Sequence, residues 1–124
     1  DNFRKRTTRE SLAQRAGGVG DMALALLDVA DDLDGAAAAA ADDDTPLANG
    51  LKLLREKLLG VLAAKGVERI DTPNVAFDPA RHDAVQRVDR TEDDAEGETV
   101  AQVFRPGYVL GDRVLRAAMV VVRQ

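Results

Sequence analysis

Apolar residues in the first third of the chain recur in steps of four and three. This spacing places them along one side of a helix and is typical of a helix that packs against another helix. The positions of this seam are Leu12, Ala16, Val19, Ala23, Leu26, Ala30, Leu33 and Ala37. Because residues 1–41 contain no proline, we predict one long helix over this range. Met22, Leu24 and Leu27 widen the apolar stripe in the middle, as in a bundle of more than two helices.

Three glycines, Gly17, Gly18 and Gly20, lie inside this predicted helix. Each glycine in a helix interior costs about 1 kcal/mol relative to alanine. We therefore expect the helix to be locally weak or kinked here. The alternative is a soft point that melts on warming and serves a function.

A second helix is predicted after a break at residues 42–46. Thr45 or Asp44 can cap this helix, with Pro46 at its first position. Its apolar residues again step by four and three, at Leu47, Leu51, Leu54, Leu58 and Val61, with Leu53, Leu59 and Leu62 broadening the face. A lysine followed by Gly66 is typical of a helix end. A hairpin with apolar faces this wide cannot bury them alone, so we predict a homodimer whose hairpins form a four-helix bundle.

After Gly66 the apolar period changes from that of a helix to that of strands. The sequence predicts short strands at residues 67–70, 84–88, 98–104 and 117–122. The polar, acidic residues 89–97 predict an exposed loop between strands. We therefore predict an α+β protein with a helical dimerisation domain over residues 1–66 and a small all-β domain over residues 67–124.

The stretch over residues 107–122 combines turn glycines, positive charges and a short apolar run that predicts a buried strand. Gly111 and the following aspartate are suited to a two-residue hairpin turn. Gly107 permits a positive φ angle or a close backbone approach. Arg113 and Arg116 precede the apolar run and give it a cationic rim, which favours binding over catalysis.

The composition indicates a mildly acidic protein. Charged residues make up 31% of the 124 residues, and the formal net charge is −5. Acidic residues cluster at residues 31–34, 42–44 and 92–94. A surface of this sign repels phosphate, so the charge argues against a nucleic-acid partner.

The chain has no cysteine, which excludes disulfides and thiolate metal sites. We expect no cofactor and no metal. No apolar run approaches the roughly 20 residues of a membrane-spanning helix, and the charged, polar start of the chain is not a secretory signal. We therefore expect a cytoplasmic protein with no membrane partner. The chain begins without methionine inside a predicted helix, so we expect it to be part of a longer protein.

The only histidine, His82, lies four residues after Asp78. An aspartate and a histidine at this spacing can bind metal or act as general acid and base. The alternative is structural: Asp78 caps a one-turn helix that begins at Pro79, and His82 closes the turn. A single histidine with no nearby nucleophile favours the structural interpretation, so we expect no catalytic residues.

One basic cluster, which includes Arg4, Lys5, Arg6 and Arg9, lies near the start of the chain. On a helix such a cluster is commonly a solvated face. The alternative is that it docks an acidic partner. The cluster is too small to indicate DNA binding against the acidic balance of the chain.

A long, ordered set of residues links the chain to a known family. These residues are Phe77-Asp78-Pro79, His82, Ala84-Val85, Gly107-Tyr108, Leu110, Arg113, Leu115-Arg116 and Ala118-Met119-Val120. In this set, and in the basic cluster on the long helix, the chain resembles the GrpE family, the nucleotide exchange factors of Hsp70 (DnaK-type) chaperones. The resemblance implies a stress-response co-chaperone, not an enzyme. It would bind the chaperone's ATPase domain, open the nucleotide cleft and release ADP.

The resemblance also implies a fold and a set of site residues. The fold is a homodimer of long paired helices with a four-helix bundle and a compact β-domain on each protomer. The partner-binding positions that it implies are Arg113, Val122, Phe104, Phe77, Pro79, Arg4 and Lys5. The dimer and bundle positions are Leu12, Ala16, Val19, Ala23, Leu26, Ala30, Leu33, Leu51, Leu54 and Leu58. The resemblance assigns His82, Gly107 and Tyr108 to shaping the β-domain.

The chain departs from the family's pattern in several places. Gly35 stands where the family often has a basic residue, which removes one contact. The acidic loop over residues 91–98 looks longer than usual. By the resemblance, the sequence is expected to begin inside the family's long helix, without its N-terminal part. The glycines in the remaining part are expected to shift the family's temperature response to lower temperature.

The sequence leaves two other functions open. The first is a structural coiled-coil dimer whose β-domain binds some other protein. The second, weaker one is a hydrolase that uses His82 and Asp78.

Overall fold

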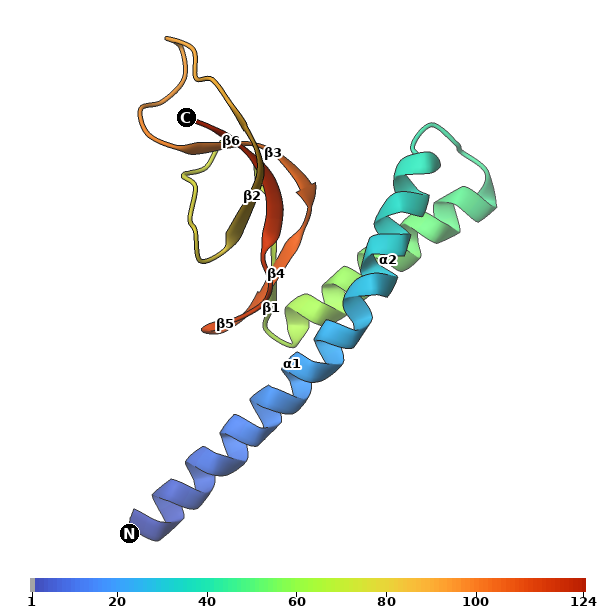
Figure 1. The fold of residues 1–124 in the computed structure, drawn as a ribbon. Coiled ribbons are helices and arrows are strands. Elements are labelled where there is room, and N and C mark those ends of the chain that lie inside the picture. Colours follow the sequence, from blue (N-terminus) through green and yellow to red (C-terminus); the bar gives the residue numbers. More distant parts are fainter. Residues whose placement is uncertain (1) are drawn as a thin grey trace. The chain divides into compact units, whose positions relative to one another are not determined.

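The chain folds into two compact units, Asp1–Lys65 and Gly66–Gln124 (Figure 1). The structure is a computed structural model that describes the backbone of residues 2–124, together with all side chains in that range except residue 8 and residues 10–16. The first unit is helical and the second is built from strands. The predicted α+β class is therefore confirmed.

The helical unit consists of α1 (Asn2–Ala39) and α2 (Pro46–Ala64). α1 has 38 residues and is about 57 Å long at the usual rise per residue. It continues without a break through the three glycines. A methyl group added at Gly17 or Gly18 meets no atom within 4 Å, so the space around these two positions does not require glycine.

The start of α2 has the predicted capping residues. The Thr45 side chain accepts a hydrogen bond from the Ala48 backbone N–H at 3.3 Å, and Pro46 occupies the first helical turn. The Asp43 carboxylate in turn accepts a hydrogen bond from the Thr45 N–H at 2.9 Å, and this bond lowers the pKa of Asp43. α2 ends at Ala64, and Gly66 follows with a φ angle of +88°. That left-handed conformation favours glycine and ends the helix, as predicted.

α1 and α2 pack against each other along one face of each helix. On α1 the buried side chains are Ala23, Leu27 and Ala30, whereas Leu26 and Leu33 are half-buried. The sequence had placed Leu27 only at the edge of the seam. Ala23 and Ala30 belong to the predicted seam, so the face towards α2 follows the seam but includes Leu27 in place of Leu26. The intra-chain partner, α2, selects that face, and the four-and-three spacing alone does not identify it.

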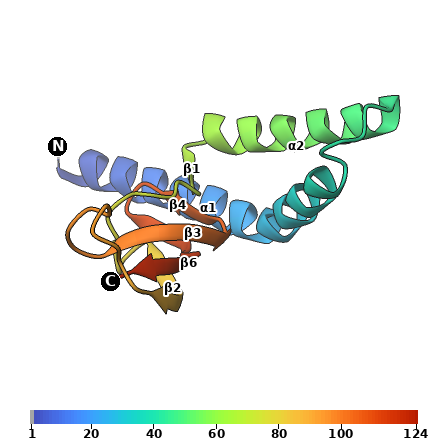
Figure 2. The same ribbon diagram turned by 90° about the horizontal axis from the view of Figure 1, so that it is seen from above.

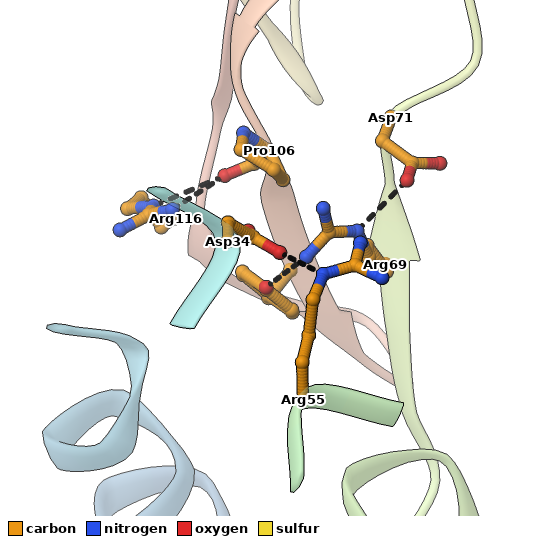
Figure 3. Close-up of polar contacts among 7 residues, drawn as sticks. Asp34, Arg55, Arg69, Asp71, Pro106 and Arg116 are labelled. Atoms are coloured by element: carbon orange, nitrogen blue, oxygen red, sulfur yellow. Dashed lines mark hydrogen bonds and ion pairs between the residues drawn. The ribbon is translucent and has the colours of Figure 1, made fainter. Parts of the chain in front are cut away.

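An ion pair reinforces the packing of the two helices. The Arg55 side chain on α2 donates a hydrogen bond to the Asp34 carboxylate on α1 at 2.6 Å, with both side chains partly buried (Figure 3). The residues lie on the half-buried flank of the interface, where solvent screening is reduced. This pair therefore favours one register of α2 along α1.

The other predicted bundle residues differ in their exposure. Leu51 and Leu58 are half-buried, Val19 is half-buried, and Leu54 is exposed within one chain. Leu12 and Ala16 lie outside the described side chains.

The β-unit contains six strands among its described residues. They are β1 (Val67–Ile70), β2 (His82–Val88), β3 (Thr99–Arg105), β4 (Gly107–Leu110), β5 (Arg113–Arg116) and β6 (Ala118–Arg123). The strands predicted at residues 67–70, 84–88, 98–104 and 117–122 are all present with small shifts at their ends. Residues 89–97 form the predicted loop between β2 and β3.

The strands form two small sheets, one with the order β1-β4-β5 and one with the order β2-β6-β3. The first sheet is antiparallel. In the second sheet β6 lies in the middle (Figure 2), parallel to β2 and antiparallel to β3. Because both faces of a central strand are covered, its apolar residues follow one another without alternation.

The core of the β-unit lies on and around β6. Its fully buried members are Val100, Ala118, Val120 and Val122, with Ile70, Phe77, Ala84 and Val103 packed against them. The apolar run before the chain end therefore forms a buried strand, as predicted. The two sheets are continuous with each other, because β3 leads into β4 through Pro106 and β5 leads into β6 through Ala117.

These two connections cross at very short range. A Cβ atom added to Gly107 would lie 2.5 Å from the Ala118 backbone nitrogen and 2.8 Å from the Arg116 carbonyl oxygen. Since real Cβ atoms do not approach backbone atoms this closely, the crossing requires glycine. This is the close backbone approach that the sequence predicted for Gly107.

The residues before β2 form a hydrogen-bonded turn rather than the one-turn helix predicted at Pro79. The Asp78 carboxylate accepts a hydrogen bond from the Ala80 N–H at 3.0 Å. The Asp78 carbonyl accepts from the N–H groups of Arg81 and His82. β2 begins at His82, so the chain becomes extended before a helical turn can propagate.

Candidate partner-binding site

The β4–β5 hairpin presents the predicted contact residue Arg113 on the surface of the β-unit. Leu110 pairs with Arg113 across a two-residue turn in which Gly111 has a φ angle of +58°. This left-handed conformation confirms the predicted hairpin turn. Arg113 is exposed at the first position of β5. The hairpin therefore displays a guanidinium group, a group suited to bidentate contact with a carboxylate.

A buried tyrosine lies in the same hairpin. Tyr108 on β4 is only 1% exposed, and its hydroxyl accepts a hydrogen bond from Arg69 on β1 at 2.7 Å. Arg69 also donates to Asp71 at 2.8 Å (Figure 3). The guanidinium carbon atoms of Arg69 and Arg116 lie 5.8 Å and 5.5 Å from the centre of the Tyr108 ring, within range of a cation–π contact. These contacts join β4 to both β1 and β5 and thereby stabilise the β4–β5 hairpin.

Phe104 and Val122, which were predicted to lie on or beside the contact face, have very different environments. Phe104 on β3 is 53% exposed, so its ring is accessible to a partner. Val122 on β6 is fully buried in the core. The structure therefore leaves Val122 no surface with which to contact a partner. Its place in the core results from the central position of β6.

Phe77 and Pro79 line an open groove of about 660 Å³ at the start of β2. The groove also includes His82, Arg87 and Glu98. Arg87 and Glu98 form an ion pair at 2.8 Å, and Asp83 adds a further carboxylate to the lining. Phe77 also packs on the core, so it has a structural role as well as an accessible edge.

His82 is a buried structural residue. Its side chain is 6% exposed, and its ring stacks on that of Phe77 with the centroids 5.8 Å apart. Its Nδ1 atom accepts a hydrogen bond from the Asp78 backbone N–H at 2.9 Å. Burial lowers the pKa of His82, opposed in part by the negative charge of Asp78. The Asp78 carboxylate is engaged in the turn, so the two side chains do not form the acid–base pair that a hydrolase would need.

Arg4 and Lys5 lie on the helical unit, in the first turns of α1, and both are exposed. The predicted contact residues therefore fall in three places: on α1, on the β4–β5 hairpin, and on β3 with the segment before β2. The sequence placed Arg116 in the cationic rim beside Arg113, but it did not indicate that Arg69 and Arg116 contact Tyr108. Their register opposite Tyr108 is a long-range property that a local pattern does not carry.

No helix among the described residues is both long enough and apolar enough to cross a membrane. The described residues also hold no group of three or more metal-ligating side chains.

The described residues thus form a hairpin of one long and one shorter helix and a small β-unit that displays an exposed arginine. The comparisons with known proteins identify the family of the chain. The family model described as GrpE matches residues 1–124. The chain therefore belongs to the GrpE family.

Several curated relatives agree with this assignment. A protein named Protein GrpE from Fructilactobacillus sanfranciscensis is 40% identical over 125 residues, which covers 99% of this chain and 69% of the relative. Protein GrpE from Deinococcus radiodurans is 36% identical, covering 98% of this chain and 53% of the relative. Protein GrpE 2 from Streptomyces avermitilis is 41% identical, covering 98% and 59%. The chain thus spans little more than half to about two thirds of the length of these relatives.

Proposed function

We propose that this chain is the functional region of a nucleotide exchange factor, a co-chaperone for Hsp70 (DnaK-type) chaperones. It binds the ATPase domain of the chaperone, opens the nucleotide cleft and accelerates the release of ADP. The observation that carries this proposal is the match of the family model to the full 124 residues. The structural observation that agrees with it is the exposed Arg113 on a well-supported hairpin.

The proposed mechanism requires no covalent chemistry. A protein that binds the open form of the ATPase domain more tightly than the closed form shifts the equilibrium towards the open form. By thermodynamic linkage, the exchange factor weakens the chaperone's affinity for ADP by the same factor by which bound ADP weakens the chaperone's affinity for the exchange factor. The residues proposed to make these contacts are Arg113 and Phe104 on the β-unit and Arg4 and Lys5 on α1. Phe77 and Pro79 contribute the edge of the groove.

The buried Val122 takes a different part in this proposal from the one that the resemblance implied. It shapes the sheet that carries Phe104, because β3 pairs directly with β6 and Val100 lies opposite Val122. A partner is contacted through the residues displayed by this sheet, not through Val122.

We further propose that the protein acts as a homodimer in which paired helices form a four-helix bundle. Within one chain α2 exposes Leu47, Leu54 and Val61, which recur every seven residues along one side of the helix, and also Leu53. A contiguous apolar face of this kind marks an interaction surface in a water-exposed protein. The partner set therefore consists of the Hsp70 ATPase domain and a second copy of the chain. The acidic net charge of −5 argues against nucleic acid, and we propose the cytoplasm as the compartment.

The release of a fluorescent ADP analogue from an Hsp70 ATPase domain, followed by stopped flow, tests the exchange activity. The unsubstituted protein is expected to accelerate release. Arg113→Ala is expected to reduce that acceleration about tenfold at a limiting concentration, as for a central contact residue. The same variant is expected to keep the oligomeric mass, measured by light scattering.

The matched control is Arg90→Ala. Arg90 is an exposed arginine in the loop that follows β2, and this loop lies at the opposite end of the β-unit from β5 (Figure 1). This variant loses the same charge and is expected to retain the exchange activity. If the unsubstituted protein leaves ADP release unchanged, the exchange function is wrong. The coiled-coil dimer that binds another protein would then be favoured.

A further inference from the structure

Three aromatic and cationic residues form one row across the sheet β1-β4-β5. Arg69 on β1 pairs with Tyr108 on β4, and Tyr108 pairs with Arg116 on β5. Both guanidinium groups lie over the tyrosine ring, at 5.8 Å and 5.5 Å from its centre. The tyrosine is thus enclosed by the side chains of its two cross-strand neighbours, which explains in part why it is only 1% exposed.

Arg116 also binds the backbone at the connection between the two sheets. Its Nε and one Nη atom donate hydrogen bonds to the Pro106 carbonyl oxygen at 3.1 Å and 2.7 Å (Figure 3). Pro106 joins β3 to β4, and Arg116 itself ends β5 just before the connection to β6. The Arg116 side chain therefore joins the β3–β4 connection to the end of β5, where the chain passes into β6 and crosses Gly107. A guanidinium is suited to this task because its rigid fork presents two donors to a single oxygen while its plane lies over a ring.

A β-bulge links Arg116 to the exposed Arg113. Tyr108 pairs with Arg116, but the next residue, Val109, pairs with Val114, so the register shifts by one residue. In a regular strand, residues three apart point to opposite faces. The bulge cancels this difference. Arg113 pairs with Leu110, which lies two residues from Tyr108 and points to the same side of β4, so Arg113 and Arg116 share one face of the sheet. Leu115, the extra residue, is buried.

We propose that Arg116 is a positioning residue for partner binding. It acts through the bulge, which it holds by its bonds to Pro106 and its contact with Tyr108, and it thereby fixes the face on which Arg113 is displayed. This inference rests on the proposed exchange function, because it assigns Arg116 a part in presenting Arg113 to the chaperone. Arg116 itself need not touch the partner.

A double-mutant cycle tests the proposal. The affinity for the nucleotide-free Hsp70 ATPase domain and the acceleration of ADP release are measured for the unsubstituted protein, Arg113→Ala, Arg116→Ala and the double variant. Arg116→Ala is expected to weaken binding about tenfold when Arg113 is present and less than about twofold when it is absent. A residue that only stabilises the β-unit would give additive effects. Arg116→Ala combined with Phe104→Ala is expected to be additive, because Phe104 lies on the other sheet.

Arg116→Lys separates positioning from charge. Lysine keeps the positive charge but lacks the fork that binds the Pro106 oxygen, so a loss of about threefold is expected. It also replaces Arg116→Ala in the cycle if the alanine variant fails to fold, as judged by the near-ultraviolet signal of Tyr108. Arg90→Ala serves as the matched loss of charge.

The possible results separate the two proposals. No acceleration by the unsubstituted protein overturns the exchange function and with it the role of Arg116. Acceleration by the unsubstituted protein, together with additive effects of the Arg113 and Arg116 substitutions, overturns only the positioning role. Unchanged binding by Arg116→Lys, or an equal loss in Arg90→Ala, shows that charge alone matters and also overturns it.

Discussion

The helical unit and the β-unit differ in how completely one chain buries their apolar residues. The β-unit buries Val100, Ala118, Val120 and Val122 completely within one chain. α2 leaves Leu47 at 86% and Leu54 at 58% exposure. The β-unit therefore closes its own core, whereas the helices keep an apolar face that one chain does not cover.

The difference follows from how each unit is built. A central strand such as β6 has neighbours on both edges and side chains covered on both faces, so a small unit of about 60 residues can still enclose a few valines. Two helices share only one face each, and the remaining apolar stripe has nothing to pack on. The folding of the β-unit is thus expected to be intrinsic, and the stability of the helical unit is expected to depend on association.

The largest expected effect comes from Gly107→Ala in the β-unit. The added Cβ would lie 2.5 Å from the Ala118 backbone nitrogen, and backbone atoms at a strand crossing cannot move aside as a flexible side chain would. We expect a loss of roughly 3 kcal/mol or more of folding free energy. Urea unfolding followed by near-ultraviolet circular dichroism measures it selectively, because the chain has one tyrosine and no tryptophan, and Tyr108 belongs to the β-unit.

Gly97→Ala is the matched control for this prediction. Gly97 also lies in the β-unit and has a φ angle of +88°, but an added Cβ meets no atom within 4 Å. Its substitution is expected to cost only about 1 kcal/mol, from backbone strain alone. Equal losses in the two variants would show that the crossing at Gly107 is not a tight constraint.

The second expected effect concerns the exposed face of α2. Leu54→Glu places a carboxylate in the proposed bundle, where it would have to lose its hydration. We expect association to weaken by at least about 30-fold, a change of roughly 2 kcal/mol. Light scattering across a dilution series would then show the mass of one chain where the unsubstituted protein shows two. The β-unit signal of Tyr108 is expected to stay unchanged.

Ala63→Glu provides the control for this substitution. Ala63 is exposed and lies about two and a half turns further along α2, on the opposite side of the helix. It introduces the same carboxylate away from the apolar face. If both variants remain dimeric, or both become monomeric, the face around Leu54 is not the association surface.

The sequence allowed the local elements of both units to be predicted. The four-and-three spacing, Thr45 with Pro46 and the final Gly66 are local signals, and the structure places helix ends at these residues. The sequence did not identify which face of α1 packs on α2. Apolar spacing indicates that a helix has a buried face, but it does not specify which element covers that face. Leu27 is buried for that reason, although the spacing favoured Leu26.

The candidate site was predictable only in part. The Gly111 turn and the exposed Arg113 follow from local sequence. The parallel pairing of β2 with β6 joins distant segments, and no local pattern specifies it. The Arg69–Tyr108 bond spans 39 residues and was missed for the same reason. The burial of Val122 agrees with the buried strand predicted from the unbroken apolar run, whereas the family resemblance had placed Val122 on or beside the contact face.

The third expected effect is a gain of stability in the helical unit. Gly18 is exposed in α1, and an added methyl group meets no atom within 4 Å. Gly18→Ala is therefore expected to stabilise the helix by about 1 kcal/mol, the opposite sign to the same change at Gly107. The midpoint of the helical transition at 222 nm is expected to rise by several degrees, with the Tyr108 signal unchanged.

Gly35→Ala serves as a control for a glycine outside the glycine-rich stretch. It too has open space for a methyl group and is expected to give a similar gain. If Gly18→Ala lowers the midpoint whereas Gly35→Ala raises it, the backbone around Gly18 needs glycine for a reason other than its intrinsic helix propensity.

The smallest expected effect is a pH dependence confined to the β-unit. Burial lowers the pKa of His82 below its ordinary value of 6.5, so the unfolded chain binds a proton more readily than the folded one. The stability is therefore fully present above about pH 6.5 and decreases as the pH falls towards the folded pKa. Protonation would also remove the Nδ1 lone pair that accepts the Asp78 N–H. His82→Asn keeps an acceptor in that place but does not titrate, so the decrease below about pH 6.5 should be absent from its unfolding curves. A decrease of the same size in both proteins would assign the pH dependence to the carboxylates instead, and an unchanged 222 nm transition would show that the helical unit does not share it.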